Sequence, residues 1–453
     1  MRPALRPRVF VLFIGDIFFF LFSLWLSLMV RLSFSVGHLA LPSQALFGEH
    51  LVPFSLLSVV WVGVFFIAGL YEARAVALGR RSLSGTLLTA QIVNVTIAAL
   101  FFFFIAVFGI EPKTLLFIYL AVSFLFILFW RAILFPLFGL ARGERMIVVG
   151  EGIDVDELVH ALEVRGARSV PQLRPGETPA LAERVAALAL TEETRFIVAD
   201  WHDARVAAAF PALYNLLARG IRFLDTSALY EEVFGRVSLD TLDERWLARS
   251  TSRAMHLLYD PLKRVADIVL AIVGGIISLI FYPFIIFAIK MDDHGPIFVR
   301  LDRVGKNGAV FPLLKFRSMT GNDNAAYGKS GTTTLRVTRV GHFLRKSRLD
   351  ELPQFWNLLR GEVSSVGPRP ESPALVALYE KEIPYYGVRH FIKPGLTGWA
   401  QLYHDNHPHH GAAVAATREK LSYDLYYLEH RSLMLDVVIT LKTIKKLLMR
   451  SGA

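Results

Sequence analysis

Residues 268–289 read IVLAIVGGIISLIFYPFIIFAI, a stretch that contains no charged side chain. By length it could cross the hydrocarbon core of a membrane, which takes roughly 20 apolar residues. Lys263 and Arg264 precede it and Lys290 follows it, so a crossing would violate the positive-inside rule at one end. Pro283 also lacks a backbone donor and breaks the helix. These features favour a helix–break–helix hairpin that enters and leaves the membrane on one face, with a crossing as the alternative.

Four further apolar stretches fill the first third of the chain, and each has roughly the 20 residues that a membrane span needs. They run over residues 9–30, 51–71, 83–110 and 114–140. Asp16 and Arg131 are the charges inside them, and we expect both near a span end, where the side chain reaches water. No clear cleavage site follows the first stretch, which therefore reads as a membrane anchor rather than a signal peptide.

The basic residues between these stretches predict the orientation. Arginines cluster before the first stretch, between the second and third, and after the fourth. The other two loops hold little more than Arg31 and Lys113. The positive-inside rule therefore places the N-terminus and the segment after the fourth stretch in the cytoplasm.

The overall composition agrees with a membrane protein. The chain has 453 residues, of which 54% are hydrophobic, and a formal net charge of +10. Such a basic protein suits anionic lipid head groups, phosphorylated substrates or nucleic acid. The chain has no cysteine, which excludes disulfides, thiolate zinc sites and cysteine nucleophiles.

Residues 143–250 have the pattern of a small α/β domain. Short apolar runs at 146–150, 195–200 and 221–224 alternate with helical spacing such as that of 156–165, which predicts a parallel sheet. Gly150 and Gly152 hint at a dinucleotide-binding loop, but Val155 stands where a third glycine would be needed. A structural or regulatory module is the favoured interpretation.

Residues 290–450 carry the motifs with chemistry. Arg303, Lys315 and Arg317 alternate with aromatic residues, a pattern that suits binding of phosphates or nucleic acid. A basic surface that faces the membrane is the alternative interpretation.

A pair of adjacent carboxylates, Asp350 and Glu351, follows Arg348. Because Pro353 is tolerated in the first turn of a helix, we expect a helix to begin near Asp350 and to end at Gly361. A simple N-cap would explain the aspartate alone. Two neighbouring carboxylates point about 100° apart on a helix, so one could attack phosphorus while the other steers a metal or a proton.

Two proline-containing loops complete the set. Pro368 and Pro370 hold Arg369 in a stiff loop, which suits bidentate contact with a diphosphate, although an exposed turn is the alternative. Pro394-Gly395 fits the centre of a type II turn, after which Thr397 and Gln401 could hold the edge of a base or sugar.

The histidines of segment 404–410 cluster within a few residues. Their spacing lacks helical geometry and a carboxylate partner, so a polar loop is favoured over a metal site.

In this order the motifs resemble the bacterial sugar transferase family, the monotopic phosphoglycosyl transferases. The resemblance covers roughly 260–450, and the remainder of the chain looks like the larger, polyprenyl-phosphate hexose-1-phosphate transferases. Leu301, where the family usually has glutamine, and the long stretch 320–335 depart from the pattern. The matching residues are Gly295-Pro296-Ile-Phe298, Arg303-Val-Gly305, Lys315-Phe-Arg317-Ser-Met319, Leu349-Asp350-Glu351-Leu-Pro353-Gln354, Gly361-Glu362, Val366-Gly-Pro368-Arg369-Pro370 and Lys393-Pro-Gly395-Leu-Thr-Gly398.

The expected fold is that of a membrane protein in three parts. Residues 1–142 form a four-helix transmembrane region, and residues 143–250 form a Rossmann-like α/β cytoplasmic domain. Residues 260–453 form a re-entrant membrane helix with an α-rich catalytic domain. The resemblance implies the bacterial inner membrane, with the catalytic domain on its cytoplasmic face.

The resemblance also implies an activity and its residues. Sugar-1-phosphate would pass from a UDP-sugar to undecaprenyl (polyprenyl) phosphate through a phosphosugar ester on Asp350, initiating exopolysaccharide or O-antigen assembly. Asp350 and Glu351 would be the catalytic pair and the ligands of Mg²⁺. The candidates for substrate binding are Arg303, Lys315, Arg317, Arg348, Pro368, Arg369, Pro370, Thr397 and Gln401.

The expected partners are the UDP-sugar donor, the polyprenyl phosphate acceptor and the lipid bilayer, without nucleic acid. The competing class is a non-catalytic membrane signalling or nucleic-acid-binding protein with a basic cytoplasmic domain, which leaves Asp350 and Glu351 without a purpose. The identity of the sugar and the choice between monomer and homo-oligomer stay open.

Overall fold

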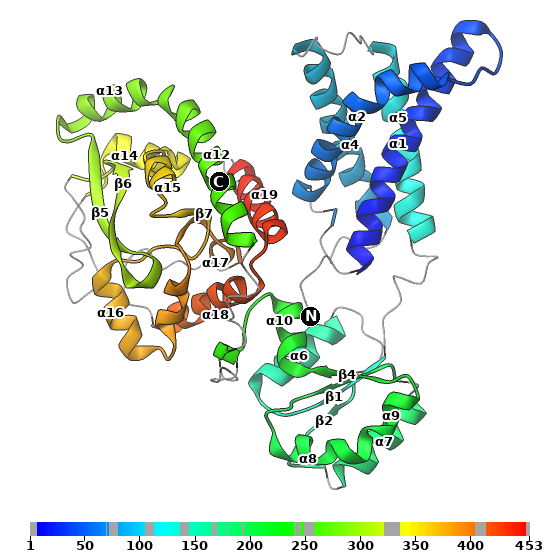
Figure 1. Cartoon of the computed structure of the whole chain (residues 1–453), viewed down its shortest axis with the longest axis vertical. Coiled ribbons are helices and arrows are strands. Elements are labelled where there is room, and N and C mark those ends of the chain that lie inside the picture. Colours follow the sequence, from blue (N-terminus) through cyan, green and yellow to red (C-terminus); the bar gives the residue numbers. More distant parts are fainter. Residues whose placement is uncertain are drawn as a thin grey trace.

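A computed structural model describes residues 7–68, 70–71, 80–104, 113–135, 145–164, 170–178, 180–192, 194–239, 242, 246–248, 258–320, 336–403 and 414–449. These residues form a helical bundle, an α/β unit and a C-terminal unit of helices and short strands (Figure 1). The histidine-rich segment 404–410 and residues 321–335 lie outside the described residues.

The helical bundle contains the four predicted spans. Each of its four long helices is apolar and long enough to cross a membrane, as the sequence predicts. Helix α1 packs against α2 and α5, and α4 packs against both α2 and α5. Buried aromatic rings fill the space between them, with Trp61 and Tyr119 at a centroid distance of 5.2 Å. The helices are α1 (Pro7–Val36), α2 (Gln44–Ile67), α4 (Arg80–Phe104) and α5 (Lys113–Phe129), which continues as the π-helix η2 (Trp130–Leu134).

Asp16 and Arg131, the two charged residues inside the predicted spans, form a buried ion pair. Arg131 Nε donates to Asp16 Oδ1 at 3.0 Å, and Arg131 Nη2 donates to Asp16 Oδ2 at 2.5 Å. Arg131 Nη1 also donates to the carbonyl of Leu70 at 2.8 Å, and the Tyr71 hydroxyl donates to Asp16. The expectation that both charges lie near water at a span end is therefore wrong, because each neutralises the other inside the bundle.

The α/β unit is built on a four-stranded parallel sheet in the order β2-β1-β3-β4. The strands predicted at 146–150, 195–200 and 221–224 are present, whereas β2 is too short to stand out in the sequence. Buried side chains of α6 and α10 cover one face of the sheet, and those of α7 and α8 cover the other. The strands are β1 (Met146–Val149), β2 (Gln172–Leu173), β3 (Phe196–Ala199) and β4 (Arg222–Asp225), and the helices are α6 (Ile153–Val164), α7 (Leu181–Thr191), α8 (Ala204–Leu213), α9 (Asn215–Ala218) and α10 (Thr226–Phe234).

The C-terminal unit packs helices around an antiparallel hairpin, β5–β6, and a short parallel pair, β7–β8. Its strands are β5 (Phe298–Val304), β6 (Val310–Phe316), β7 (Ser364–Val366) and β8 (Gly395–Thr397). Its helices are α12 (Tyr259–Leu279), α13 (Tyr282–Asp293), α14 (Arg339–Ser347), α15 (Gln354–Arg360), α16 (Pro373–Glu382), α17 (Trp399–Tyr403), α18 (Val414–His430) and α19 (Leu433–Met449), with 3-10 turns η5 (Lys306–Gly308), η6 (Leu349–Glu351) and η7 (Tyr386–Phe391).

The uncharged stretch 268–289 forms two helices, α12 and α13, that are bent by 56° at the break between them. Pro283 lies in the first turn of α13, as its missing donor requires. On the inner face of α12, a Cβ at Gly274 would lie 2.5 Å from the Phe355 ring, so α12 and α15 pack very closely there. Apolar side chains cover the outer face of the pair and are exposed at Val269, Ile272, Val273, Ile276, Ile280, Phe284 and Phe287.

Polar contacts hold the first half of α12 to the C-terminal unit. The buried Asp267 carboxylate accepts hydrogen bonds from Ser364 Oγ at 2.8 Å and from the Ser365 backbone N–H at 2.9 Å. One turn earlier, Lys263 lies 2.7 Å from Asp436 of α19. The polar half of α12 is therefore bound to the C-terminal unit through these side chains, whereas the apolar half packs on α15 at Gly274 and exposes its outer face.

Replacing Arg131 by Met is expected to destabilise the bundle by about 3–5 kcal/mol, because it leaves the Asp16 charge buried without a partner. The measurement is reversible unfolding in mixed detergent micelles. The double variant Asp16→Asn/Arg131→Met should recover part of the loss, since no unpaired charge remains. Wild-type stability of the single variant would show that the ion pair is not needed.

Candidate active site

Asp350 and Glu351 lie in the 3-10 turn η6, between α14 and α15. The helix predicted to begin near Asp350 is only a 3-10 turn at that position, because Arg348 takes a left-handed conformation (φ 60°) that ends α14, and the α-helix α15 begins at Gln354. Gly361 ends α15 as predicted, with φ 80°. The two carboxylates are thus held at a tight turn between two helices.

Lys315 is the cation closest to both carboxylates. Its Nζ lies 2.8 Å from Glu351 Oε1 and 3.7 Å from Asp350 Oδ2. The buried Asn357 of α15 fixes the strand that carries Lys315, since its Oδ1 accepts from the Leu314 backbone N–H at 2.9 Å. Sheet and helix together therefore place the ammonium against the carboxylate pair.

The surroundings act oppositely on the two carboxyl groups. Burial raises the pKa of Asp350 above its ordinary value, and the nearby charge of Lys315 counters this only in part. Burial also raises the pKa of Glu351, but Lys315, Arg369 and Arg348 outweigh it and lower that pKa to about 2. Glu351 is therefore the firmly ionised member of the pair.

The loop after β7 brings Arg369 toward the pair, where its charge acts on Glu351. Two backbone hydrogen bonds shape this loop: Gly367 N–H donates to Thr397 at 2.9 Å, and Gly395 N–H donates to Pro368 at 2.9 Å. In addition, Arg389 Nη2 donates to the Arg369 carbonyl at 3.0 Å. Hydrogen bonds therefore hold the backbone of this loop at Gly367, Pro368 and Arg369.

Sequence reasoning missed the buried support of this loop. Arg389 forms an ion pair with Asp424 at 2.7 Å, and both side chains are almost fully buried. It also missed Asp267, whose position directly before the uncharged stretch is the one local signal for a special role. Arg389 and Asp424 carry no such signal, because they meet only in the folded chain.

Two predicted phosphate ligands lie apart from the carboxylate pair. Arg303 of β5 lies opposite Phe311 of β6 in the hairpin. Phe311 is four residues from Lys315 on the same strand, so Arg303 and Lys315 are about 13 Å apart along the hairpin. The Arg317 guanidinium packs directly against Gly295. A Cβ added at Gly295 would lie 1.6 Å from Arg317 Nη1, so no side chain fits at position 295. In this conformation Arg317 supports the turn before β5.

The predicted type II turn at Pro394-Gly395 is wrong. Gly395 begins β8 and pairs with Ser364, and its φ is not positive as that turn requires. Thr397 Oγ1 lies 2.7 Å from Thr443 Oγ1 of α19, and the Gln401 carbonyl accepts from Lys446. These two residues therefore contact α19 rather than the carboxylate pair.

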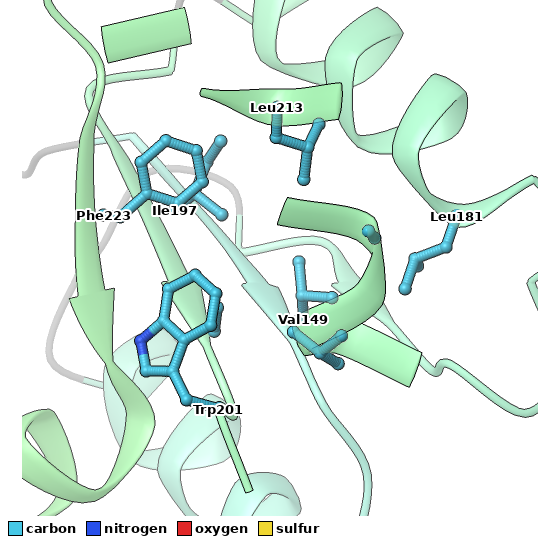
Figure 2. Close-up of a pocket in the computed structure, with 9 residues that line it drawn as sticks. Val149, Leu181, Ile197, Trp201, Leu213 and Phe223 are labelled. Carbon is cyan, nitrogen blue, oxygen red and sulfur yellow. The ribbon is translucent and has the colours of Figure 1, made fainter. Parts of the chain in front are cut away.

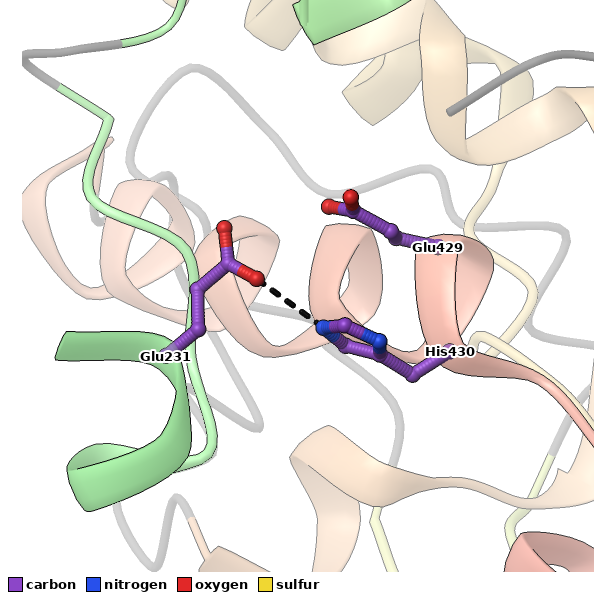
Figure 3. Close-up of side chains that lie close together, drawn as sticks. All are labelled: Glu231, Glu429 and His430. Carbon is purple, nitrogen blue, oxygen red and sulfur yellow. Dashed lines mark hydrogen bonds and ion pairs between the residues drawn. The ribbon is translucent and has the colours of Figure 1, made fainter. Parts of the chain in front are cut away.

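Two other features of the described residues carry no comparable chemistry. A cavity in the α/β unit is lined by apolar and aromatic residues, among them Val149, Trp201 and Phe223, and its lining contains no charged side chain (Figure 2). Glu231, Glu429 and His430 are close enough together to hold a cation (Figure 3). His430 Nε2 is already 2.9 Å from Glu231, and this pair joins α10 to α18.

The fold and the site define a class of protein: a membrane-associated protein whose adjacent carboxylates, the buried Asp350 and the half-buried Glu351, are surrounded by cations that suit phosphate groups. Residues 258–450 match the family model described as bacterial sugar transferase. The chain belongs to this family, as its motifs indicate.

Curated relatives agree with this membership. The UDP-N-acetylgalactosamine-undecaprenyl-phosphate N-acetylgalactosaminephosphotransferase of Aeromonas hydrophila is 37% identical over 57% of this chain and 60% of its own length. The UDP-glucose:undecaprenyl-phosphate glucose-1-phosphate transferase of Caulobacter vibrioides is 38% identical over 42% of this chain and 71% of its own length. An uncharacterized sugar transferase of Bacillus subtilis is 34% identical over 42% of this chain and 89% of its own length. The chain thus spans about 60% of the Aeromonas protein.

Glu351 should make stability depend on pH in a defined window. Its pKa of about 2 lies below the ordinary 4.5, so the ionised carboxylate stabilises the fold above pH 4.5 and loses this contribution as the pH falls toward 2. Glu351→Gln should therefore be less stable at neutral pH and lose less stability between these two pH values. Thermal unfolding in detergent across pH is the measurement.

The matched control is Glu382→Gln, which alters an exposed glutamate at the end of α16. It should reproduce the wild-type curve. If Glu351→Gln also follows the wild-type curve throughout, the ionised Glu351 does not stabilise the site.

Proposed function

We propose that this chain transfers a sugar-1-phosphate from a UDP-sugar to undecaprenyl phosphate through a covalent phosphosugar ester on Asp350. The observation that carries the proposal is the buried Asp350 itself, whose Oδ1 has no hydrogen-bond partner among the described residues. A carboxylate oxygen with a free lone pair beside several cations is suited to attack a phosphate. The names of the Aeromonas and Caulobacter relatives contain both a UDP-sugar and undecaprenyl phosphate.

In the first step, Asp350 Oδ1 attacks the β-phosphorus of the donor. The bond from that phosphorus to the oxygen bridging the two phosphates breaks, and UMP leaves with the electron pair. Lys315, Arg348 and Arg369 surround the carboxylate pair and are placed to neutralise the diphosphate. The product is a phosphosugar ester of Asp350.

In the second step, a phosphate oxygen of undecaprenyl phosphate attacks the same phosphorus. The ester bond to Asp350 breaks and the carboxylate is regenerated, so one pocket serves both steps. The product is an undecaprenyl diphosphate sugar, the starting lipid for exopolysaccharide or O-antigen assembly.

Asp350 and Glu351 together would fit a magnesium ion, because Mg²⁺ prefers carboxylate oxygens and the pair offers Glu351 and the Asp350 oxygen that does not attack phosphorus. When bound, Mg²⁺ would neutralise charge on the diphosphate. Glu351, firmly ionised by the cations around it, is the member suited to hold it throughout the cycle.

The bent helix pair α12–α13 supplies the membrane side of the site, and we propose that it is re-entrant. Both of its ends are bonded to the same folded unit. Asp267 near the start of α12 binds Ser364, and Asp292 at the end of α13 accepts from the Val340 backbone N–H at 3.0 Å. Because one unit cannot lie on both faces of a membrane, the exposed apolar residues between these ends would enter and leave on one side.

The proposed location is the inner membrane, with the C-terminal unit in the cytoplasm. Four crossings by α1, α2, α4 and α5 and the clustered arginines support this orientation. A water-soluble donor and a lipid acceptor would then meet at one interfacial site.

Asp350→Asn should reduce turnover to background, since an amide oxygen cannot form and regenerate the phosphate ester. The measurement is UMP release from UDP-glucose and UDP-N-acetylgalactosamine with undecaprenyl phosphate. The exposed Asp302→Asn on β5 is the control and should keep wild-type turnover. Turnover by Asp350→Asn at the wild-type rate would disprove the nucleophile.

The re-entrant arrangement can be tested by labelling, because the natural chain has no cysteine. Single variants Leu258→Cys and Arg300→Cys place one thiol at exposed positions on either flank of α12–α13. Both should react with a membrane-impermeant maleimide from the cytoplasmic side. Leu41→Cys, exposed between α1 and α2, should react from the opposite side. Labelling of the two flanks from opposite sides would establish a crossing instead.

A further inference from the structure

The α/β unit and the C-terminal unit meet at one unusual contact. The indole of Trp399, at the start of α17, donates from Nε1 to the carbonyl of Gly235 at 2.6 Å. Gly235 ends α10 in a left-handed conformation with φ 66°. A Cβ on Gly235 would lie 3.1 Å from Trp399 Cζ2, so the backbone of the α/β unit touches the indole directly.

The indole is rigidly held on its own side of the contact. Trp399 is buried, and its ring stacks on Tyr426 of α18 at a centroid distance of 5.5 Å and an interplanar angle of 19°. A movement of Gly235 would therefore act on the backbone of α17 and β8 rather than be absorbed by a change of rotamer.

The residues before Trp399 touch the loop that carries Arg369. A Cβ on Gly398 would lie 2.3 Å from the Gly367 carbonyl, which shows how closely the two backbones approach. The Thr397 carbonyl accepts from Gly367 N–H at 2.9 Å. Arg369 is two residues after Gly367. A short path of hydrogen bonds and covalent bonds, from Gly235 through Trp399, Thr397 and Gly367, therefore connects the α/β unit to Arg369, whose charge acts on Glu351.

Neighbouring contacts make this interface more than a single hydrogen bond. The backbone N–H of Val237 donates to the Ser422 carbonyl at 3.1 Å. Arg236 Nη1 lies 3.3 Å from Glu419. Glu231 of α10 and His430 of α18 form the hydrogen bond shown in Figure 3. Helix α10 and the residues after it are thus fixed to α18, which also carries the ring beneath Trp399.

We propose that Trp399 is a positioning residue through which the α/β unit holds the Arg369 loop in its diphosphate-binding conformation. This inference rests on the proposed function for the role of Arg369. In this proposal the α/β unit restrains the backbone of residues 366–370 through Gly235. That restraint raises the affinity of the site for a nucleoside diphosphate. The unit itself needs no ligand for this.

Two variants perturb the contact from opposite sides. Trp399→Phe removes the N–H donor and keeps an aromatic ring on Tyr426. Gly235→Ala leaves the indole intact and pushes a methyl group against it. Each has a matched control inside the α/β unit. Trp201→Phe is the same exchange in the apolar cavity of Figure 2, and Gly220→Ala imposes the same backbone strain at φ 82° where a Cβ meets nothing within 4 Å.

The experiment uses the full chain in nanodiscs and has two readouts. The first is hydrogen–deuterium exchange of the peptide 366–371 without ligand, and the second is the Kd for UDP with Mg²⁺. Both test variants should exchange faster in that peptide and bind UDP about five-fold more weakly, the factor that corresponds to one lost hydrogen bond. Both controls should match the wild type in the two readouts.

Wild-type exchange in peptide 366–371 for both test variants would overturn the proposal, and so would faster exchange spread evenly over the C-terminal unit. Faster local exchange with unchanged UDP affinity would also overturn it. These results are independent of turnover, so they are distinguishable from a failure of the proposed function, which the Asp350→Asn assay decides.

Discussion

Asp350 and Glu351 are both shielded from bulk water at the turn between α14 and α15. Both can be ionised there only if positive charge lies close to them. Lys315 supplies most of it, at 2.8 Å from Glu351 and 3.7 Å from Asp350. Asn357 fixes the hairpin β5–β6 through the Leu314 backbone N–H, and the hairpin in this register places the Lys315 ammonium at the pair. The same requirement explains Arg348 at the end of α14 and Arg369 on the loop after β7.

The bent helix pair α12–α13 contacts the same residues that shape the charged site. Asp267 of α12 binds Ser364 and Ser365, which lead directly into the Arg369 loop. Gly274 brings α12 against Phe355 of α15, the helix that follows the carboxylate pair. Consequently the apolar surface and the charged site have a fixed relation, as a reaction between a soluble donor and a lipid acceptor would need.

Local patterns predicted the parts of this protein that depend on local physics. Hydropathy identified the four spans, short apolar runs identified β1, β3 and β4, and Gly361 marked the end of α15. Features made by distant residues could not be predicted. Asp16 and Arg131 are 115 positions apart, and the pairing of Gly395 with Ser364 replaced the turn that Pro394-Gly395 suggested. Asp350, Glu351, Lys315 and Arg348 do meet, and the charge of Arg369 acts on Glu351, but the proposed chemical roles of these residues remain predictions.

In the proposed mechanism the buried Asp350 becomes esterified by sugar phosphate in each cycle. Mass spectrometry of enzyme quenched after mixing with its UDP-sugar, without acceptor, detects this ester. We expect a peptide containing Asp350 that is heavier by one sugar phosphate, and disappearance of this species once undecaprenyl phosphate is added. Turnover with no such adduct at any time, or an adduct on another residue, would contradict it.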